Sequence, residues 1–306
     1  MLVRLNGKEK ISRPRTVGLA LSGGGLRGAA HIGVLLALTR AGIPIDMIAG
    51  TSAGAVVAAL YASGFSAAQM IRMAAALNTS ELIDLKVTVG DLVKHGFKWL
   101  VNGKFRFWSV LPAGFIKGDH IEAYLQNYLY TKTVRDTRIP LAITAVDLES
   151  GDTVFFITPI PGSRSILNAR YYYNTPLVEA VRASISIPGV FYPKQYRGMT
   201  LVDGAVKNNL PTDILRYMGC DVILAVDLGY DGQPVAEVKT VGEVLMQCIE
   251  IMGREVTLLK GIQYADAVIR PDVYGLNMKH SHYLEQAIER GEQAAQKKIY
   301  EIKQIM

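Results

Sequence analysis

Apolar and polar positions alternate along the chain in blocks that predict an α/β protein. Two short, nearly uninterrupted apolar runs, residues 16–22 and 45–49, each lead into glycine, as is typical of strands buried on both faces of a parallel sheet. Apolar residues recur at helical spacing over 26–41, and a second helical run covers 53–63. This order predicts a βαβ unit with parallel strands, and ligand sites in such sheets form at the carboxyl ends of the strands.

The rest of the chain continues the mixed pattern. Further strands are expected at 141–146, 153–157, 222–228 and 267–270, and further helices at 119–129, 209–218, 241–260 and 283–305. Asp119 and Glu122 predict a capping box at the start of the first of these helices. Because no repeat or low-complexity linker interrupts the pattern, we expect a single domain over 16–306, preceded by a flexible basic arm at 1–15.

Composition narrows the class of protein. The 306 residues are 50% hydrophobic, which excludes a disordered chain, and 33 Lys and Arg against 27 Asp and Glu give a net charge of +6. This excess is too small to indicate a nucleic-acid partner. The two cysteines, Cys220 and Cys248, lack the spacing of a disulfide framework or a metal site, which fits a reducing compartment.

Membrane insertion is not expected from the hydropathy of the chain. The N-terminal residues have no apolar core of a secretory signal. The most apolar window, 48–65, is rich in Gly, Ala, Ser and Thr and begins at a glycine-flanked turn, which favours a buried helix over a membrane span. We therefore expect a cytoplasmic protein whose contact with a membrane, if it makes one, is peripheral at the inner face.

One stretch, residues 86–118, concentrates basic and aromatic side chains. Six of its residues are basic and one is acidic, and it holds both tryptophans, Trp99 and Trp108. Interleaved rings and ammonium groups suit the interface of an anionic bilayer, so the stretch is a candidate membrane flap. The alternative is an ordinary insertion whose aromatic residues pack on the core and whose lysines face water.

Ser52 is the first candidate for chemistry. It lies in Gly50-Thr51-Ser52-Ala53-Gly54, which matches the G-x-S-x-G elbow that holds a nucleophilic hydroxyl on a strained turn between a strand and a helix. A strand is expected before it and a helix after it, as the elbow requires. The alternative reading of these glycines is a close contact between a helix and a strand.

The segment Gly23-Gly24-Gly25-Leu26-Arg27-Gly28 follows the first strand and allows three interpretations. It satisfies the dinucleotide fingerprint G-x-G-x-x-G, but the acidic residue expected at the end of the second strand is missing, since Asp46 lies at the start of that strand. A P-loop is excluded because Ala29 stands where lysine is needed. The third interpretation, an oxyanion hole made of glycine N–H groups, is favoured by the expected proximity to Ser52.

A serine nucleophile needs a base, and none of the five histidines lies in a recognisable motif. Asp203 is more distinctive, because it follows the apolar pair Leu201-Val202 and precedes a glycine, which places it at the end of a short strand. An isolated Asp-Gly pair is most often a turn. Asp147 and Asp227 also follow predicted strands and are rival candidates, although loop capping explains both.

Three sequence blocks in the same order resemble the patatin-like phospholipases, specifically the bacterial members related to neuropathy target esterase. They are GLALSGGGLRGAAHIGVL at 18–35, GTSAGA at 50–55 and DGA at 203–205, supported by RASISIPGVFYP at 182–193 and DGAVKNNLP at 203–211. The resemblance extends over about 17–228. It implies a three-layer α/β/α sandwich with a mostly parallel central sheet.

The resemblance also implies roles for individual residues. Ser52 would be the nucleophile and Asp203 the general base of a Ser-Asp dyad, with Gly23, Gly24 and Gly25 as the oxyanion hole. Arg27 would steady the glycine loop or meet a lipid phosphate, and no metal or cofactor is implied. An ordinary aspartate, with a pKa of ~3.9, is a weak base, so the dyad requires a dry pocket that raises this pKa.

The expected activity is that of a serine lipid acyl hydrolase acting on a lipid ester. Transfer of the acyl group to an alcohol or thiol, and a non-catalytic lipid-binding regulator on the same fold, are the alternatives. The sequence does not define the lipid or the oligomeric state.

Overall fold

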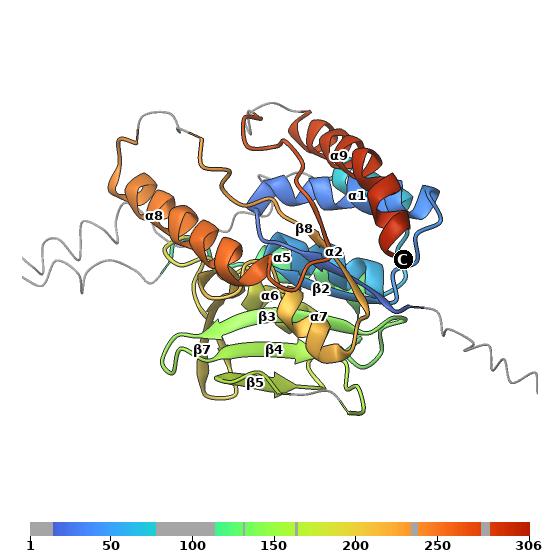
Figure 1. Cartoon of the computed structure of the whole chain (residues 1–306). Coiled ribbons are helices and arrows are strands. Elements are labelled where there is room, and N and C mark those ends of the chain that lie inside the picture. The colour runs from blue at the N-terminus through green and yellow to red at the C-terminus, as the bar shows by residue number, and fades with distance from the viewer. Residues whose placement is uncertain (1–14, 78–113, 131, 163–164, 234–237, 277–281) are drawn as a thin grey trace, which may run out of the picture.

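The described strands form one mixed sheet (Figure 1). A computed structural model describes residues 15–77, 114–130, 132–162, 165–233, 238–276 and 282–306. The strand order is β5-β4-β3-β2-β1-β8-β9, with β7 beside both β3 and β6. The strands are β1 (Val17–Leu21), β2 (Met47–Thr51), β3 (Leu141–Asp147), β4 (Thr153–Ile157), β5 (Ala169–Tyr172), β6 (Lys194–Tyr196), β7 (Met199–Asp203), β8 (Val222–Val226) and β9 (Ala267–Ile269).

Helices cover both faces of the sheet. The helices are α1 (Ala29–Arg40), α2 (Ala53–Ala62), α3 (Ala67–Ala75), α5 (Asp119–Leu129), α6 (Leu177–Ser184), α7 (Thr212–Met218), α8 (Val241–Val256) and α9 (Tyr283–Ile305). Side chains of α1, α2, α5, α6 and α9 share one buried cluster with the sheet, and side chains of α7 belong to a second cluster on its other face. The neighbours β1–β2, β2–β3, β1–β8 and β8–β9 are all parallel. The expected three-layer fold with a mostly parallel sheet is thus confirmed.

Several predicted elements agree with the structure. The strand at 153–157 and the helix at 283–305 have the predicted bounds, and the apolar window 48–65 contains the end of β2 and the mostly buried helix α2. The helix predicted at 241–260 ends earlier, because a π-helical turn, η5 (Thr257–Gly261), follows α8. Within the described residues, no helix is both long and apolar enough to cross a bilayer.

The predicted capping box was wrong. Helix α5 does begin at Asp119, but its N-cap is Gly118, with φ 81°, and a glycine has no side chain with which to form a capping box. The Glu122 carboxylate accepts a hydrogen bond from Lys194 Nζ at 2.5 Å instead. The carboxylate that local spacing assigned to a capping box thus forms an ion pair with Lys194, which is distant in the sequence.

Two sequence predictions fall mainly outside the described residues. Of the basic arm, only Arg15 is described, and its guanidinium donates to the carbonyl of Ile305. Of the basic aromatic stretch, residues 86–113 are outside, and Phe115 and Ile116 both donate backbone hydrogen bonds to Val190 O. The membrane flap and the single domain stay predictions.

The sheet brings the ends of two strands together beside β3. Strand β2 is parallel to β3 and its last residue, Thr51, pairs with Thr144. Strand β7 is antiparallel to β3 and its last residue, Asp203, pairs with Ala145, whose other side is taken by β4. Strands β2 and β7 therefore run toward each other along the same side of β3, and their carboxyl ends meet. This meeting point positions the candidate site.

Candidate active site

Ser52 follows β2 in a strained turn that glycines make possible. Its backbone angles are φ 55° and ψ −124°, in a region that residues other than glycine rarely adopt. A Cβ at Gly50 would lie 2.4 Å from Gly54 O, and a Cβ at Gly54 would lie 2.3 Å from Leu21 O. Both glycines are thus required for the close approach of α2 to β1 and β2, and the predicted elbow is present.

The hydroxyl of Ser52 donates a short hydrogen bond to Asp203. The distance from Ser52 Oγ to Asp203 Oδ2 is 2.6 Å, and the two residues are 3% and 2% exposed. The other carboxylate oxygen, Oδ1, accepts the N–H of Ala205 at 2.8 Å. Burial raises the pKa of Asp203 to about 7, although the two hydrogen bonds act in the opposite direction. A carboxylate of this basicity can accept a hydroxyl proton near neutral pH.

Ser184 holds the backbone of Ser52 in place. The Ser52 N–H donates to Ser184 Oγ at 2.8 Å, and Ser184 Oγ donates to Thr144 O at 2.7 Å. Ser184 therefore ties the strained turn to β3. Sequence reasoning missed this residue, although it lies inside the block 182–193 that carried part of the family resemblance.

The glycine loop lies against the dyad, but its three N–H groups are not equivalent. Gly23 N–H donates to Asn209, at 3.2 Å to the carbonyl oxygen and 3.1 Å to Oδ1. This bond removes Gly23 from the predicted set of oxyanion donors. The N–H groups of Gly24 and Gly25 have no hydrogen-bond partner among the described residues, and both glycines line the same cavity as Ser52. They stand at the start of η1 (Gly25–Gly28) and α1, where a helix N-terminus favours negative charge.

Arg27 contacts the loop rather than standing free in the cavity. Its Nε donates to Gly24 O at 3.1 Å, and its Nη2 lies 2.5 Å from Glu250 Oε1 on α8. Its guanidinium also lies over the ring of Tyr274, 4.5 Å from the centroid. Of the two roles expected for Arg27, support of the loop is the one that these contacts show.

The rival residues do not reach Ser52. Asp147 accepts a hydrogen bond from Ser150 Oγ at 2.7 Å, and Asp227 Oδ1 accepts the N–H of Gly229 at 3.1 Å, so each carboxylate caps the loop that follows its strand. The ring of His31 is buried and its Nε2 bonds to Ser22 O, and burial lowers its pKa to about 4. In the described part of the chain, the hydroxyl of Ser52 thus has an aspartate rather than a histidine as its partner.

The dinucleotide interpretation also lacks its acidic residue. Asp46 Oδ2 accepts the N–H of Val17 at 2.7 Å, at the amino end of the sheet and away from the glycine loop. Among the described residues, no three His, Cys, Asp or Glu side chains are grouped so that they could hold a metal ion.

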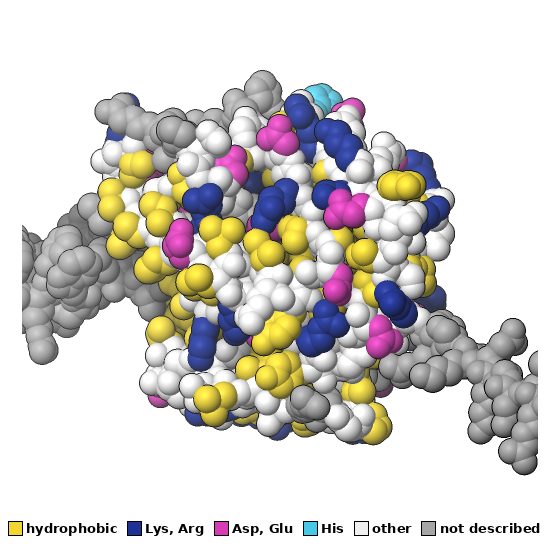
Figure 2. All heavy atoms as spheres, in the orientation of Figure 1, with side chains coloured by type: hydrophobic (Ala, Val, Ile, Leu, Met, Phe, Trp, Pro, Cys, Tyr) yellow, Lys and Arg dark blue, Asp and Glu magenta, His cyan; other side chains and the backbone are white. Residues whose placement is uncertain are grey.

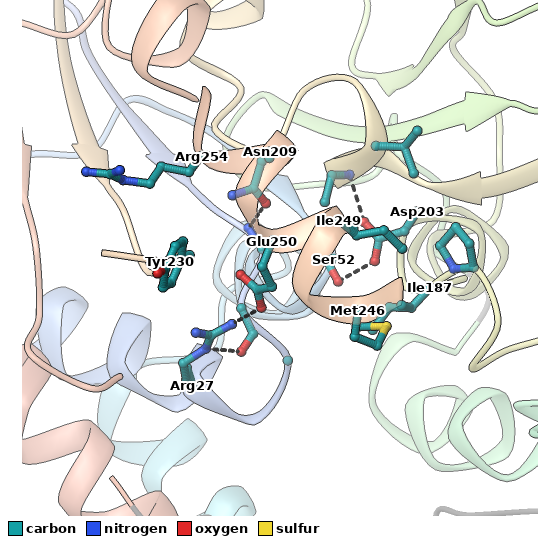
Figure 3. A pocket seen from close by; sticks show the side chains of 18 residues that line it. Arg27, Ser52, Ile187, Asp203, Asn209, Tyr230, Met246, Ile249, Glu250 and Arg254 are labelled. Carbon is teal, nitrogen blue, oxygen red and sulfur yellow. Dashed lines mark hydrogen bonds and ion pairs between the residues drawn. The ribbon is translucent and has the colours of Figure 1, made fainter. Parts of the chain in front are cut away.

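The site opens into a small cavity of about 80 Å³ (Figure 3). Figure 3 shows Ser52 and Asp203 on one side, and Arg27, Tyr230 and Arg254 on the other. Helix α8 forms part of the wall of this cavity. The apolar part of the lining comes from Ala205, Val206, Ile187, Pro188, Met246 and Ile249.

The three-layer fold and the strained serine bonded to an aspartate at its sheet edge define a patatin-like protein. A family model described as patatin-like phospholipase matches residues 19–216, more than half of the chain. The chain therefore belongs to the patatin-like phospholipase family, and the resemblance inferred from the motifs is confirmed.

Individual relatives support this membership. The chain is 30% identical over 232 residues to patatin-like phospholipase domain-containing protein 6 of Homo sapiens, covering 75% of this chain and 14% of that protein. It is also 30% identical over 229 residues to an uncharacterized NTE family protein of Mycobacterium tuberculosis, covering 74% and 53% of the two chains. The chain thus spans about half, or much less, of the length of these relatives.

A solved structure shares the fold. VipD from Legionella pneumophila matches with a TM-score of 0.51 and 13% identity, covering 94% of this chain and 67% of that one.

Proposed function

We propose that this chain is a serine lipid acyl hydrolase that cleaves a carboxylic ester through an acyl-enzyme. The observation that carries the proposal is the 2.6 Å hydrogen bond from Ser52 Oγ to the buried carboxylate of Asp203. Family membership supports a lipid ester as the substrate. The apolar side chains around the dyad support an acyl chain as the group that lies in the cavity.

In the first half of the reaction, Ser52 Oγ attacks the ester carbonyl carbon and Asp203 takes the hydroxyl proton. The carbonyl oxygen becomes negative and is stabilised by the N–H groups of Gly24 and Gly25. When the tetrahedral intermediate collapses, the bond to the alcohol breaks and the alcohol leaves with the proton from Asp203. The acyl group is then esterified to Ser52.

In the second half, water attacks the acyl-enzyme and Asp203 takes one of its protons. The second intermediate uses the same oxyanion donors. Its collapse breaks the bond to Ser52 Oγ, which recovers the proton from Asp203, and releases the fatty acid. One residue thus serves as base and as acid in both halves, which requires a pKa near the working pH, and burial raises the pKa of Asp203 to about 7.

Peripheral contact with a lipid surface is part of the same proposal. On the side of α8 away from the cavity, four large apolar residues are between 46% and 60% exposed: Val244, Leu245, Ile251 and Met252. In Figure 2, which has the orientation of Figure 1, hydrophobic side chains gather at the upper left of the molecule, where Figure 1 shows α8. Since the other side of α8 lines the cavity, contact here would bring the site next to its substrate. The cytoplasmic location stays a prediction.

The test is hydrolysis of p-nitrophenyl butyrate, a long-chain p-nitrophenyl ester and a lysophospholipid by the wild type and by Ser52→Ala, each with and without chelator. We expect turnover that depends on the serine and is insensitive to chelator. Product analysis with added alcohol or thiol acceptors separates hydrolysis from acyl transfer. A wild type that is inert on all three esters would contradict the proposal and favour a binding protein.

A further inference from the structure

Arg27 is held from three directions, and one of its partners lies far outside the catalytic motifs. Its Nε and its backbone N–H both donate to Gly24 O, each at 3.1 Å. Its terminal nitrogen contacts Glu250 at 2.5 Å, with side-chain exposures of 14% for Arg27 and 27% for Glu250. Tyr274 covers one face of the guanidinium. Glu250 is also outside residues 19–216, which the family model matches.

The carbonyl that Arg27 holds belongs to the same peptide unit as a proposed oxyanion donor. The peptide that joins Gly24 to Gly25 is planar and trans, so its C=O and N–H point in opposite directions. With the carbonyl turned toward Arg27, the N–H of Gly25 is turned away from it. Gly25 has φ 55°, and a Cβ here would meet nothing within 4 Å, whereas a Cβ at Gly24 would lie 3.1 Å from the Leu228 side chain. Packing therefore restrains the Gly24 side of this peptide and leaves the Gly25 side open. The side-chain hydrogen bond from Arg27 Nε adds to the backbone bond from Arg27 N–H in holding the carbonyl of this peptide.

We propose that Glu250 is a positioning residue for the oxyanion hole: it holds the Arg27 guanidinium, and Arg27 holds the Gly24–Gly25 peptide with its N–H available to the reacting oxygen. The inference rests on the proposed function. Figure 3 shows the chain of contacts from Glu250 through Arg27 to the loop.

This pair connects helix α8 to the glycine loop. None of the described side chains of α8 is fully buried, so apolar burial alone holds the helix weakly. The pair between Glu250 and Arg27 is partly shielded from water, which makes it stronger than an exposed ion pair. The position of α8 and the geometry of the oxyanion hole are thus coupled, and a site whose α8 is displaced loses part of its catalytic geometry.

The test compares Glu250→Ala with Glu250→Gln on p-nitrophenyl butyrate. Loss of one oxyanion donor costs roughly 100- to 1000-fold in kcat, so a donor that is only misoriented should cost about 10-fold or more. We expect Glu250→Ala to lower kcat by this amount with KM within about twofold. The glutamine still offers an oxygen to Arg27, so Glu250→Gln should stay within about threefold of the wild type.

Two further variants separate positioning from a general structural effect. Glu292→Ala is the control because it breaks an ion pair of the same length, Arg40 to Glu292 at 2.5 Å between α1 and α9. This variant should leave kcat and KM unchanged. The double variant Arg27→Met/Glu250→Ala should be no slower than Arg27→Met alone, because the two residues act through one chain of contacts.

The outcomes distinguish failure of the positioning role from failure of the proposed function. Three results would overturn the positioning role and leave the proposed hydrolase standing. They are a kcat lowered less than twofold in Glu250→Ala, an effect of this variant on KM alone, and an equal decrease of kcat in Glu250→Gln. A wild type that neither hydrolyses the ester nor reacts with a fluorophosphonate would overturn the proposed function and the positioning role together.

Discussion

Replacing Asp203 with asparagine tests whether this carboxyl is as basic as its burial implies. Asparagine has nearly the same shape, and its side-chain oxygen can accept the N–H of Ala205 as Oδ1 does now. Its amide N–H can donate to Ser52 Oγ, so the fold should be kept. The variant removes the one group whose titration is at issue, and catalysis should fall by several decades because no base remains.

The effect on stability follows from the shift in pKa. Burial raises the pKa of Asp203 from 3.8 to about 7. Between these values the folded state binds a proton that the unfolded state has lost, so the free energy of unfolding falls as pH rises. This stability is fully present below pH 3.8 and is lost by the time pH passes 7. A pKa raised by roughly 3 units corresponds to a change of about 4 kcal/mol in the free energy of unfolding, and about 3 kcal/mol of this change occurs between pH 4.5 and 8.

Urea unfolding followed by circular dichroism at pH 4.5, 6 and 8 measures the difference between wild type and Asp203→Asn. We expect this difference to shift in favour of the variant by about 3 kcal/mol between the lowest and highest pH. Asp227→Asn is the control, since Asp227 pairs with Arg270 away from the dyad. If the free energies of unfolding of the wild type and Asp203→Asn differ by the same amount at all three pH values, Asp203 has an ordinary carboxyl pKa. That result would refute the reasoning that makes Asp203 a base.

Three other predictions concern the reaction, the elbow and the fold. For the wild type, kcat/KM should rise with pH to a midpoint of about 7 and then level off, because Asp203 must be ionised to act as base; a flat stopped-assay profile from pH 5 to 9 would contradict this. Ser184→Ala leaves the N–H of Ser52 unpaired, so chemical denaturation should show a loss of ~1–3 kcal/mol and ester assays a lower kcat. Gly33→Ala places a Cβ 1.8 Å from Ile288 O, where α1 crosses α9, and should cost about 3 kcal/mol or more in thermal or urea unfolding; unchanged stability would mean that the helices are further apart.

Strong local patterns explain which parts of the fold could be predicted from sequence. The uninterrupted apolar runs of β1 and β8 and the helical periodicity of the amphipathic helix α9 are strong local signals. Strands β5 and β6 have few or no buried residues, and their apolar pattern is weak. They exist because neighbouring strands offer hydrogen bonds, which a single sequence does not display.

Only part of the site could be predicted from the sequence. Ser52, Asp203 and the glycine loop lie in short motifs whose residue types follow from the chemistry and the crowded backbone. Asn209, Ser184 and Glu250 act through contacts with residues more than 130 positions away in the chain. Only the folded chain reveals these contacts, and they change the interpretation of Gly23 and Arg27.

The most direct test of the central claim is the site and rate of modification by a fluorophosphonate, read by mass spectrometry of tryptic peptides. Attack on phosphorus requires the same activated hydroxyl as attack on an ester. The account predicts one adduct, on Ser52, in the wild type, none in Ser52→Ala, and a rate lowered by decades in Asp203→Asn but not in Asp147→Asn. An adduct on another serine, or undiminished labelling of Asp203→Asn, would contradict the Ser52–Asp203 dyad.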